Sequence, residues 1–236
     1  MRRIAVVGFL WVTVFSAGYP VANAKRCIIL TLDTCRADRL TCYGSDTSQT
    51  PHLDSLADKG VLFEDAMVSA PLTLPSHCSI FTGLLVSHHH VRDNAWYHLA
   101  DNIPTLAEQL SEEGVATAAV LAAFPVERRF GLDQGFSFYD DEFCRRGGTG
   151  QNETWHDHPY ARFERPGEEV TDTALDWLRT EGVKDDSFLL WVHYFDPHSP
   201  YEPPPPFDRR FPKHPYNGEV EAMDHAIGRL LDGIAE

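Results

Sequence analysis

The sequence predicts an α/β fold in which a largely parallel sheet is flanked by helices. Three observations support this class. Residues 27–32 form a continuous apolar, β-branched run, as expected for a strand that is buried on both faces. Residues 188–194 form a second run of this kind. Helical and strand patterns alternate along the rest of the chain, which is typical of parallel strands joined by crossover helices.

Breakers, caps and hydrophobic spacing delimit the individual elements. Thr50 and Pro51 open a helix that Gly60 stops, and Asn102 is a candidate cap for a helix that ends before Gly114. Residues 130–166 are expected to run over the surface, and the proline run at 203–206 predicts a rigid extended loop. We therefore expect strands at 27–32, 61–68, 115–122 and 188–194, and helices at 50–60, 102–113, 169–179 and 219–234.

The amino terminus has the pattern of a secretory signal peptide. A basic start, Met1-Arg2-Arg3, precedes an apolar run, and the segment closes on the Ala-x-Ala pattern that ends at Ala24. A membrane anchor is the alternative, but the apolar run is shorter than the roughly 20 residues that a membrane span needs. We expect residues 1–24 to be removed after Ala24, leaving a domain at 25–236 that is secreted or periplasmic and has no stable membrane insertion.

Composition excludes one large class of partners. The formal net charge is −15 at pH 7, so the chain is not expected to bind nucleic acid or anionic membranes without specificity. Five cysteines lie beyond the signal segment, and an odd number without a CxxC pair favours buried free thiols, although some could pair in an oxidising compartment. The sequence does not indicate an oligomeric state.

Polar residues follow three of the expected strands. Asp33 and Thr34 follow the first strand, the segment 72–77 follows the second, and the segment 196–201 follows the fourth. Ligands of open α/β sheets bind at the carboxyl ends of the strands. A carboxylate, a hydroxyl and a histidine that converge on that edge suit metal-assisted hydrolysis.

Several motifs occur in a fixed order, and together they carry a family resemblance. They are Leu32-Asp-Thr-Cys-Arg-Ala-Asp-Arg-Leu40, Cys42-Tyr-Gly44, Thr50-Pro-His-Leu-Asp54, Pro71-Leu-Thr-Leu-Pro-Ser-His77, Ser79-Ile-Phe-Thr-Gly83, Val91-Arg-Asp-Asn94, Asp196-Pro-His-Ser-Pro-Tyr201, Gly218-Glu-Val220 and Ile227-Gly-Arg-Leu-Leu231. In this order they resemble the amino-terminal part of the catalytic domain of a sulfatase, within the alkaline phosphatase superfamily. The resemblance runs from about Arg26 to the last residue and implies a sulfuric ester hydrolase.

The resemblance implies that Asp33 is a ligand of a divalent cation. The cation is calcium in typical sulfatases, and magnesium, manganese and zinc are alternatives. Oxygen ligands suit hard cations. Thr34 stands where the family has a second, adjacent aspartate, which weakens or alters the metal site. A turn or cap role for Asp33 is the structural alternative.

Thr73 stands where sulfatases have the cysteine that is oxidised to formylglycine. Threonine is a secondary alcohol and does not give that aldehyde, so no formylglycine is expected. A threonine hydroxyl activated by the metal can instead attack sulfur or phosphorus directly, which makes Thr73 both nucleophile and metal ligand. Pro75 favours the first turn of a helix whose amino end would bind the anionic ester, and Thr73 could simply cap that helix. His77 replaces the arginine that supports the nucleophile in the family.

Three further features need an assignment. His198 matches the family histidine that contacts the ester oxygens and protonates the leaving group. His193 lies inside a strand and is expected to be a core or supporting residue, and the tract 88–90 is expected to be a loop beside the site. The segment Cys35-Arg-Ala-Asp-Arg39 formally fits a formylglycine signal, but its position directly after the metal strand indicates coincidence.

Two functions remain open at this point. Family members continue with an Asp-His-Gly strand that supplies further metal ligands, and no such motif follows His198 here, so the fold is expected to be incomplete at the carboxyl-terminal end and to leave a sheet edge unpaired. The chain is then a fragment of a hydrolase of sulfate or phosphate esters. Alternatively, it is a truncated, inactive sulfatase-derived protein that binds an anion or a partner. The alcohol portion of the substrate is not indicated.

Overall fold

A computed structural model describes residues 26–142, 164–182, 184 and 187–235, together with the backbone of four short strands. These are β1 (Ala5–Val6), β2 (Val12–Thr13), β7 (Glu153–Trp155) and β8 (His158–Tyr160). Most of the expected signal peptide, including its cleavage site, lies outside the described residues, as does most of the surface excursion between 143 and 163. No helix in the described part combines the length and apolar character needed to cross a membrane.

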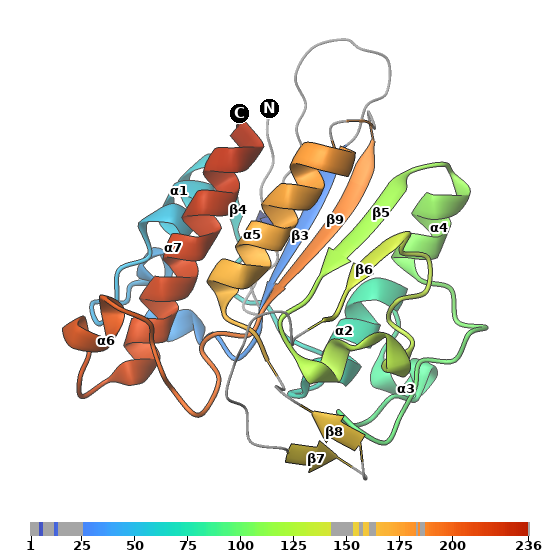
Figure 1. The fold of residues 1–236 in the computed structure, drawn as a ribbon, viewed down its shortest axis with the longest axis horizontal. Helices are drawn as coiled ribbons and strands as arrows, with labels where there is room; N and C mark the ends of the chain where they lie inside the picture. Colours follow the sequence, from blue (N-terminus) through green and yellow to red (C-terminus); the bar gives the residue numbers. More distant parts are fainter. Residues whose placement is uncertain are drawn as a thin grey trace.

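The core of the fold is a five-stranded sheet with the order β2-β3-β9-β5-β6 (Figure 1). Four strands are parallel: β3 (Arg26–Leu32), β9 (Phe188–Tyr194), β5 (Ala116–Val120) and β6 (Phe138–Asp140). Every residue of β9 is buried. The expected α/β class with a largely parallel sheet is therefore confirmed. The outer edge of β3 carries two residues of β2 in antiparallel pairing.

Helices cover both faces of this sheet. On one face lie α1 (Pro51–Lys59), α5 (Gly167–Trp177) and α7 (Pro215–Ala235), and on the other lie α2 (Thr73–Thr82), α3 (Val86–His89) and α4 (Leu106–Glu112) (Figure 1). The remaining short elements are α6 (Phe207–Arg210), the 3-10 turns Ala37–Arg39, Thr41–Tyr43, Phe124–Val126 and Arg128–Phe130, and a π-helical turn Leu178–Gly182 that extends α5.

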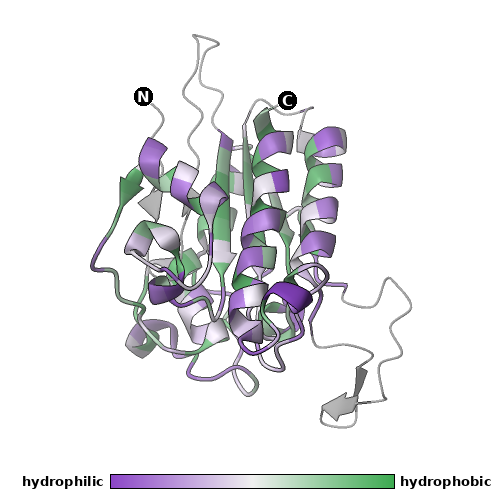
Figure 2. Ribbon diagram, turned by 90° about the vertical axis from the view of Figure 1, so that its left-hand side faces the viewer, coloured by the Kyte–Doolittle hydropathy of each residue, from purple (hydrophilic) through white to green (hydrophobic). Residues whose placement is uncertain are grey.

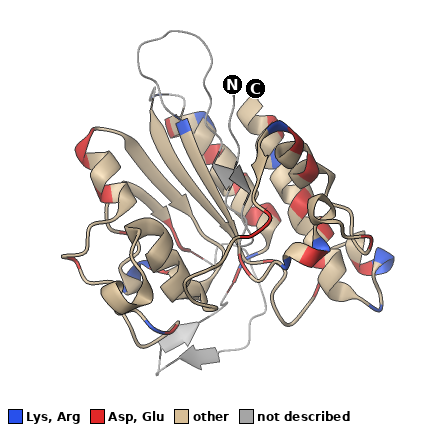
Figure 3. Cartoon of the chain, turned by 180° about the vertical axis from the view of Figure 1, so that it is seen from behind, with Lys and Arg blue, Asp and Glu red and all other residues tan. Residues whose placement is uncertain are grey.

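Alternate residues of the strands feed two separate hydrophobic cores. Leu30 and Leu190 pack with α1, α5 and α7, whereas Ile29 and Trp191 pack with α2 and α4. This is the two-sided burial that the continuous apolar runs predicted. In Figure 2 the apolar (green) residues of the helices lie on the side that faces the sheet. Figure 3 shows charged residues on helices and loops rather than along the central strands.

Three expected elements were wrong in part. The expected strand at 61–68 is only β4 (Val61–Leu62), which pairs with β1 outside the main sheet. Glu64 and Asp65 interrupt the apolar run, and Met67 is 97% exposed, so nothing buries a longer strand. The helix expected at 102–113 begins at Leu106, because Thr105 and Glu108 form a capping box. Strand β6 lies inside the segment that was expected to be surface loop.

The four described cysteines, Cys27, Cys35, Cys42 and Cys78, are free thiols. Burial raises the pKa of Cys27 and of Cys42 to about 11. The fifth cysteine, Cys144, lies outside the described residues.

A carboxylate from α7 caps the amino end of α1. Thr50, the residue before α1, makes no side-chain cap. Instead, Asp224 Oδ1 accepts the Leu53 N–H at 2.9 Å, and Oδ2 accepts the His52 N–H at 3.3 Å. Asp224 is 1% exposed, so these groups have little access to water. The contact therefore joins two helices that are far apart in sequence.

A second buried carboxylate anchors the proline-rich loop to α7. Glu219 Oε1 accepts the Glu202 N–H at 2.5 Å. Burial raises the pKa of Glu219 to about 8; the Glu202 N–H opposes this shift, and the carboxylates of Asp196 and Glu164 add to it. Glu219 is therefore largely protonated in the folded protein at neutral pH.

We predict that Asp224→Ala lowers the free energy of unfolding by about 1–3 kcal/mol, the penalty for leaving buried donors without an acceptor. Asp224→Asn keeps one carbonyl oxygen and should lose less. Urea denaturation followed by circular dichroism measures the change. Asp232→Ala, on the exposed side of the same helix, is the control and should have little effect. Equal stability of the Asp224→Ala and Asp232→Ala proteins would contradict the capping role.

We predict that the protein loses stability as the pH rises from about 5 to about 8. The carboxyl of Glu219 ionises near pH 4.5 in the unfolded chain but only near 8 in the folded one, so the unfolded state binds fewer protons across this range. The full contribution is present below the lower value and is lost as the pH passes the higher one. Glu219→Gln should flatten the dependence of the denaturation midpoint on pH. A slope that persists unchanged in this variant would assign the effect to another group.

Candidate functional site

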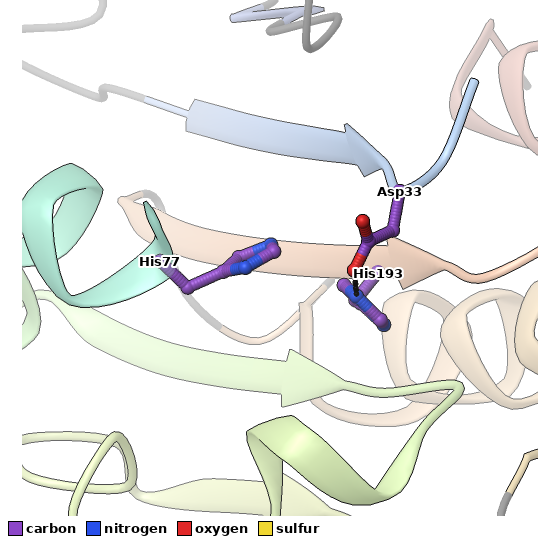
Figure 4. A group of neighbouring side chains, drawn as sticks. All are labelled: Asp33, His77 and His193. Carbon is purple, nitrogen blue, oxygen red and sulfur yellow. Dashed lines mark ion pairs between the residues drawn. The ribbon is translucent and has the colours of Figure 1, made fainter. Parts of the chain in front are cut away.

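The site lies where β3 and β9 end, with α2 packed beside them. Asp33 directly follows β3, and its backbone N–H donates to the Tyr194 carbonyl at the end of β9, at 2.9 Å. The strands pair in the register Thr31↔His193 and Leu32↔Tyr194. The side chain of Asp33 therefore emerges next to that of His193 (Figure 4). Asp33 and His193 therefore lie at the carboxyl edge of the sheet, the edge at which ligands of open α/β folds bind.

Asp33, His77 and His193 form a buried cluster. One potential ligand atom of each lies within 4.8 Å of the other two. Asp33 is 2% exposed, and both histidines are fully buried. His193 Nε2 lies 3.5 Å from Asp33 Oδ2, and the centroids of the two imidazole rings are 5.0 Å apart. Figure 4 shows the His77 ring extending from α2 towards the other two side chains.

The hydrogen bonds of the two imidazoles assign their tautomers. His77 Nδ1 lies 2.7 Å from the Thr73 carbonyl oxygen, which only accepts, so Nδ1 carries the proton and Nε2 has a lone pair. His193 Nδ1 accepts the Ala122 N–H at 3.3 Å, so in the neutral ring the proton is on Nε2 and points towards Asp33. Thus His77 offers a lone pair to the cluster, whereas His193 offers a donor.

Electrostatics keep the carboxyl of Asp33 ionised and His77 neutral. Burial by itself would raise the pKa of Asp33, but the His193 ring, His77 and the Thr73 hydroxyl together outweigh it and hold the pKa below the ordinary value. Burial, and then the neighbouring His193, lower the pKa of His77 to about 4. The cluster therefore pairs a carboxylate with an uncharged nitrogen ligand at neutral pH.

Thr73 is the first residue of α2 and lies beside this cluster. It is 7% exposed, and its hydroxyl helps to lower the pKa of the Asp33 carboxyl. Leu72, not Thr73, occupies the cap position, so a capping role for Thr73 does not apply. Leu74 N–H donates to Asn94 Oδ1 at 2.9 Å, and Pro75 has no N–H. The amino end of α2 therefore offers an anion its dipole rather than a row of N–H groups.

Thr34 joins the end of β3 to the loop that follows β9. Its backbone is left-handed, with φ 56°, and its N–H donates to Asp33 Oδ1 at 2.8 Å. Its hydroxyl faces the carbonyl oxygens of Asp33 and Pro197. The Thr34 hydroxyl thus bonds two backbone carbonyls, and Thr34 reaches the Asp33 carboxylate only through its backbone N–H.

His198 lies outside the cluster but is connected to it. Its ring stacks on Phe195 with the centroids 4.2 Å apart, and the Phe195 ring lies 5.9 Å from that of His193. His198 Nδ1 is 3.6 Å from Glu164 Oε2, and its side chain is 41% exposed. Of the five expected site residues, the structure brings Asp33, Thr73 and His77 together, with Thr34 and His198 at the edge of the group.

His193 was expected to be a core or supporting residue, and the structure agrees. It is fully buried, and its Nε2 lies 3.5 Å from the Asp33 carboxylate. The available signal was its position, because a histidine near the end of an otherwise apolar strand reaches the sheet edge where ligands bind. The tract 88–90 forms the end of α3 and the residue after it, and His89 Nε2 bonds Ser79 Oγ at 2.9 Å.

The residues present fit a divalent cation. Within the described residues, Asp33 Oδ2, His77 Nε2 and His193 Nε2 are buried side-chain atoms without a hydrogen-bond partner. Asp33 Oδ2 and His77 Nε2 are hydrogen-bond acceptors with free lone pairs, and buried acceptors normally have a hydrogen-bond partner. Asp33 and His77 could therefore hold a metal ion, with His193 orienting the carboxylate.

Comparison with known proteins identifies relatives of this chain. The family model described as Sulfatase matches residues 25–236. Human iduronate 2-sulfatase is 24% identical over 210 residues, which cover 80% of this chain and 38% of that protein. The N-acetylglucosamine-6-O-sulfatase of Bacteroides thetaiotaomicron is 25% identical over 189 residues, which cover 75% of this chain and 31% of that protein. The chain thus spans less than half of these relatives.

Solved structures share the fold. The crystal structure of Ps i-CgsB has a TM-score of 0.71 at 19% identity and matches 88% of this chain and 54% of its own. The phosphonate monoester hydrolase of Agrobacterium radiobacter has a TM-score of 0.68 at 18% identity and matches 88% of this chain and 58% of its own. The expected alkaline phosphatase-like architecture is therefore confirmed. With the family model matching almost its whole length, the chain belongs to the sulfatase family.

Proposed function

We propose that this chain is the amino-terminal part of the catalytic domain of a secreted or periplasmic, metal-dependent hydrolase of sulfate esters. The observation that carries the proposal is the buried Asp33 carboxylate beside the Thr73 hydroxyl at the carboxyl edge of the sheet. Membership of the sulfatase family supports the reaction class. The substrate is an anionic ester, and phosphate esters are a second candidate, because a phosphonate monoester hydrolase shares the fold.

Asp33, with Thr73 and His77 beside it, would hold the divalent cation. A bound cation supplies a Lewis acid that polarises an ester oxygen and makes a nearby hydroxyl more acidic. The chain itself must keep Asp33 ionised and correctly oriented. The N–H groups of Thr34 and His193 face its two carboxylate oxygens and serve this purpose.

Thr73 is the proposed nucleophile. Its oxygen attacks the sulfur or phosphorus, the bond to the alcohol oxygen breaks, and water then releases the sulfate or phosphate from threonine. The hydroxyl proton passes to a base as the new bond forms. The Asp33 carboxylate, whose pKa the Thr73 hydroxyl helps to lower, is the proposed base. No formylglycine takes part, because oxidation of a secondary alcohol gives a ketone rather than an aldehyde.

His198 is the proposed acid for the departing alcohol. Its ring stacks on Phe195, which fixes the plane of the imidazole, while the side chain remains 41% exposed. A protonated imidazole there would donate to the leaving oxygen as the ester bond breaks. Thr34 supports the site by joining the Asp33 segment to the loop that carries His198.

A non-catalytic, anion-binding or partner-binding protein is the second candidate. One observation favours it: Thr34 directs its hydroxyl to backbone carbonyls, where the family resemblance expects a second metal-binding carboxylate. This candidate predicts no turnover of any ester, even with calcium, magnesium, manganese or zinc supplied. The two candidates therefore separate in a single assay.

We predict that Thr73→Ala abolishes turnover of aryl sulfates and aryl phosphates by the full-length protein, because the attacking oxygen is removed. Thr73→Ser keeps a hydroxyl and should retain part of the activity. Thr82→Ala, at the other end of α2, is the matched control. Mass spectrometry of quenched reactions should find the sulfuryl or phosphoryl group on Thr73. Unchanged turnover in Thr73→Ala would remove this residue from the mechanism.

We predict that His198→Gln lowers kcat by about 10²–10⁴-fold for alkyl esters, the usual contribution of a general acid. The loss should be much smaller for p-nitrophenyl esters, whose leaving group departs without a proton. His214→Gln, an exposed histidine of a nearby loop, is the control. An equal loss on both ester types would show that His198 binds the substrate rather than protonating the alcohol.

A further inference from the structure

Two buried lone pairs lie close together at the end of β3. Asp33 Oδ2 and His77 Nε2 both lack a hydrogen-bond partner among the described residues, and these two side chains belong to the 4.8 Å cluster. Leaving two acceptors unsatisfied in a fully buried place is unfavourable. A cation bound between them would satisfy both at once.

The alternative is a direct proton-mediated contact between His77 and Asp33. It would require a proton on both nitrogens of His77, because Nδ1 already donates to the Thr73 carbonyl. His77 is fully buried and its ring centroid lies 5.0 Å from that of His193, and a charged imidazole is strongly disfavoured in such a place. A neutral His77 with its lone pair on Nε2 is therefore the form that the fold favours, and this is the form that binds metals.

His193 does not compete for the same role. Its Nδ1 accepts the Ala122 N–H, which leaves the proton on Nε2, facing the carboxylate. Imidazoles that donate to a metal-binding carboxylate orient it and tune its basicity. The cluster therefore divides into one oxygen ligand, one nitrogen ligand and one positioning residue.

We propose that Asp33 and His77 form a mixed oxygen–nitrogen half-site that selects a divalent cation of the zinc class over calcium. The inference rests on the proposed function, because it concerns the metal of that same site. Calcium prefers an all-oxygen shell of six to eight ligands. Imidazole nitrogen instead suits zinc, cobalt, nickel and copper. Thr34 adds to the difference, since its hydroxyl is directed to backbone carbonyls rather than to the Asp33 carboxylate.

The test is metal binding, measured without any ester. Metal-free protein is titrated with Zn²⁺ and with Ca²⁺ by calorimetry, and with Co²⁺ by visible absorption, which reports the coordination geometry of the bound ion. We expect Zn²⁺ to bind at least about tenfold more tightly than Ca²⁺. His77→Gln should weaken Zn²⁺ binding by at least about 10–100-fold, the loss that even a change outside the ligand shell causes.

Two further variants keep the test decisive. His89→Gln replaces another buried histidine, one that bonds Ser79 and lies outside the cluster, and it should bind Zn²⁺ as the unaltered protein does. Asp33→Asn should weaken both Zn²⁺ and Ca²⁺. Circular dichroism and thermal melting establish that each variant is folded, and an unfolded His77→Gln is replaced by His77→Asn.

The outcomes separate this inference from the proposed function. Tighter binding of Ca²⁺ than of Zn²⁺, or a Zn²⁺ preference that survives removal of the His77 imidazole, would overturn the inference even if the protein hydrolyses esters. A Zn²⁺ site that depends on His77 in a protein without turnover would support the inference and reject the enzymatic function.

Discussion

The buried carboxylate of Asp33 is the group on which the rest of the site depends. An ionised carboxylate removed from water is strongly destabilising unless hydrogen bonds or opposite charges compensate for the lost hydration. Here the N–H of Thr34 bonds one oxygen, and the His193 ring faces the other. The His193 ring, with His77 and the Thr73 hydroxyl, keeps the pKa of the carboxyl low despite burial. A charged group is thus held ready at a place that excludes water.

The parallel sheet supplies the precision of this arrangement. The pairing of β3 with β9 brings Asp33 beside His193, residues that lie 160 positions apart in the chain. On the same face, Leu74, Cys78 and Phe81 of α2 pack into the core beneath the strands. The His77 ring is held there by Trp191, whose ring centroid is 5.4 Å away. Core packing and site geometry therefore depend on the same contacts.

The sequence resemblance implies three replacements in the candidate site. It implies a carboxylate at position 34, a cysteine at 73 and a guanidinium at 77, where this chain has threonine, threonine and histidine. Losing one carboxylate and one guanidinium leaves the net charge of the site unchanged, while two hydroxyls and an imidazole are gained. Such groups suit the proposed direct attack by a hydroxyl better than an aldehyde-based mechanism.

The sequence by itself determined the class of fold, and it predicted the sheet edge of the candidate site and most of the polar residues that lie together there. These conclusions rest on local properties: the apolar runs of β3 and β9 demand two-sided burial, and polar residues directly after buried strands must gather at one edge. Local reasoning also overestimated one strand, because the run at 61–68 has strand-like composition but no neighbouring layer to bury it.

Only the tertiary structure decided which atoms face one another. The proton positions of His77 and His193 depend on the Thr73 carbonyl and the Ala122 N–H, and the latter belongs to a segment distant in sequence. The cap of α1 likewise comes from Asp224 on α7, where no sequence pattern marks it. Hydrogen bonds between distant segments have no periodicity or local signature. Residue types could therefore be predicted from the sequence, but their roles as donor, acceptor or ligand could not.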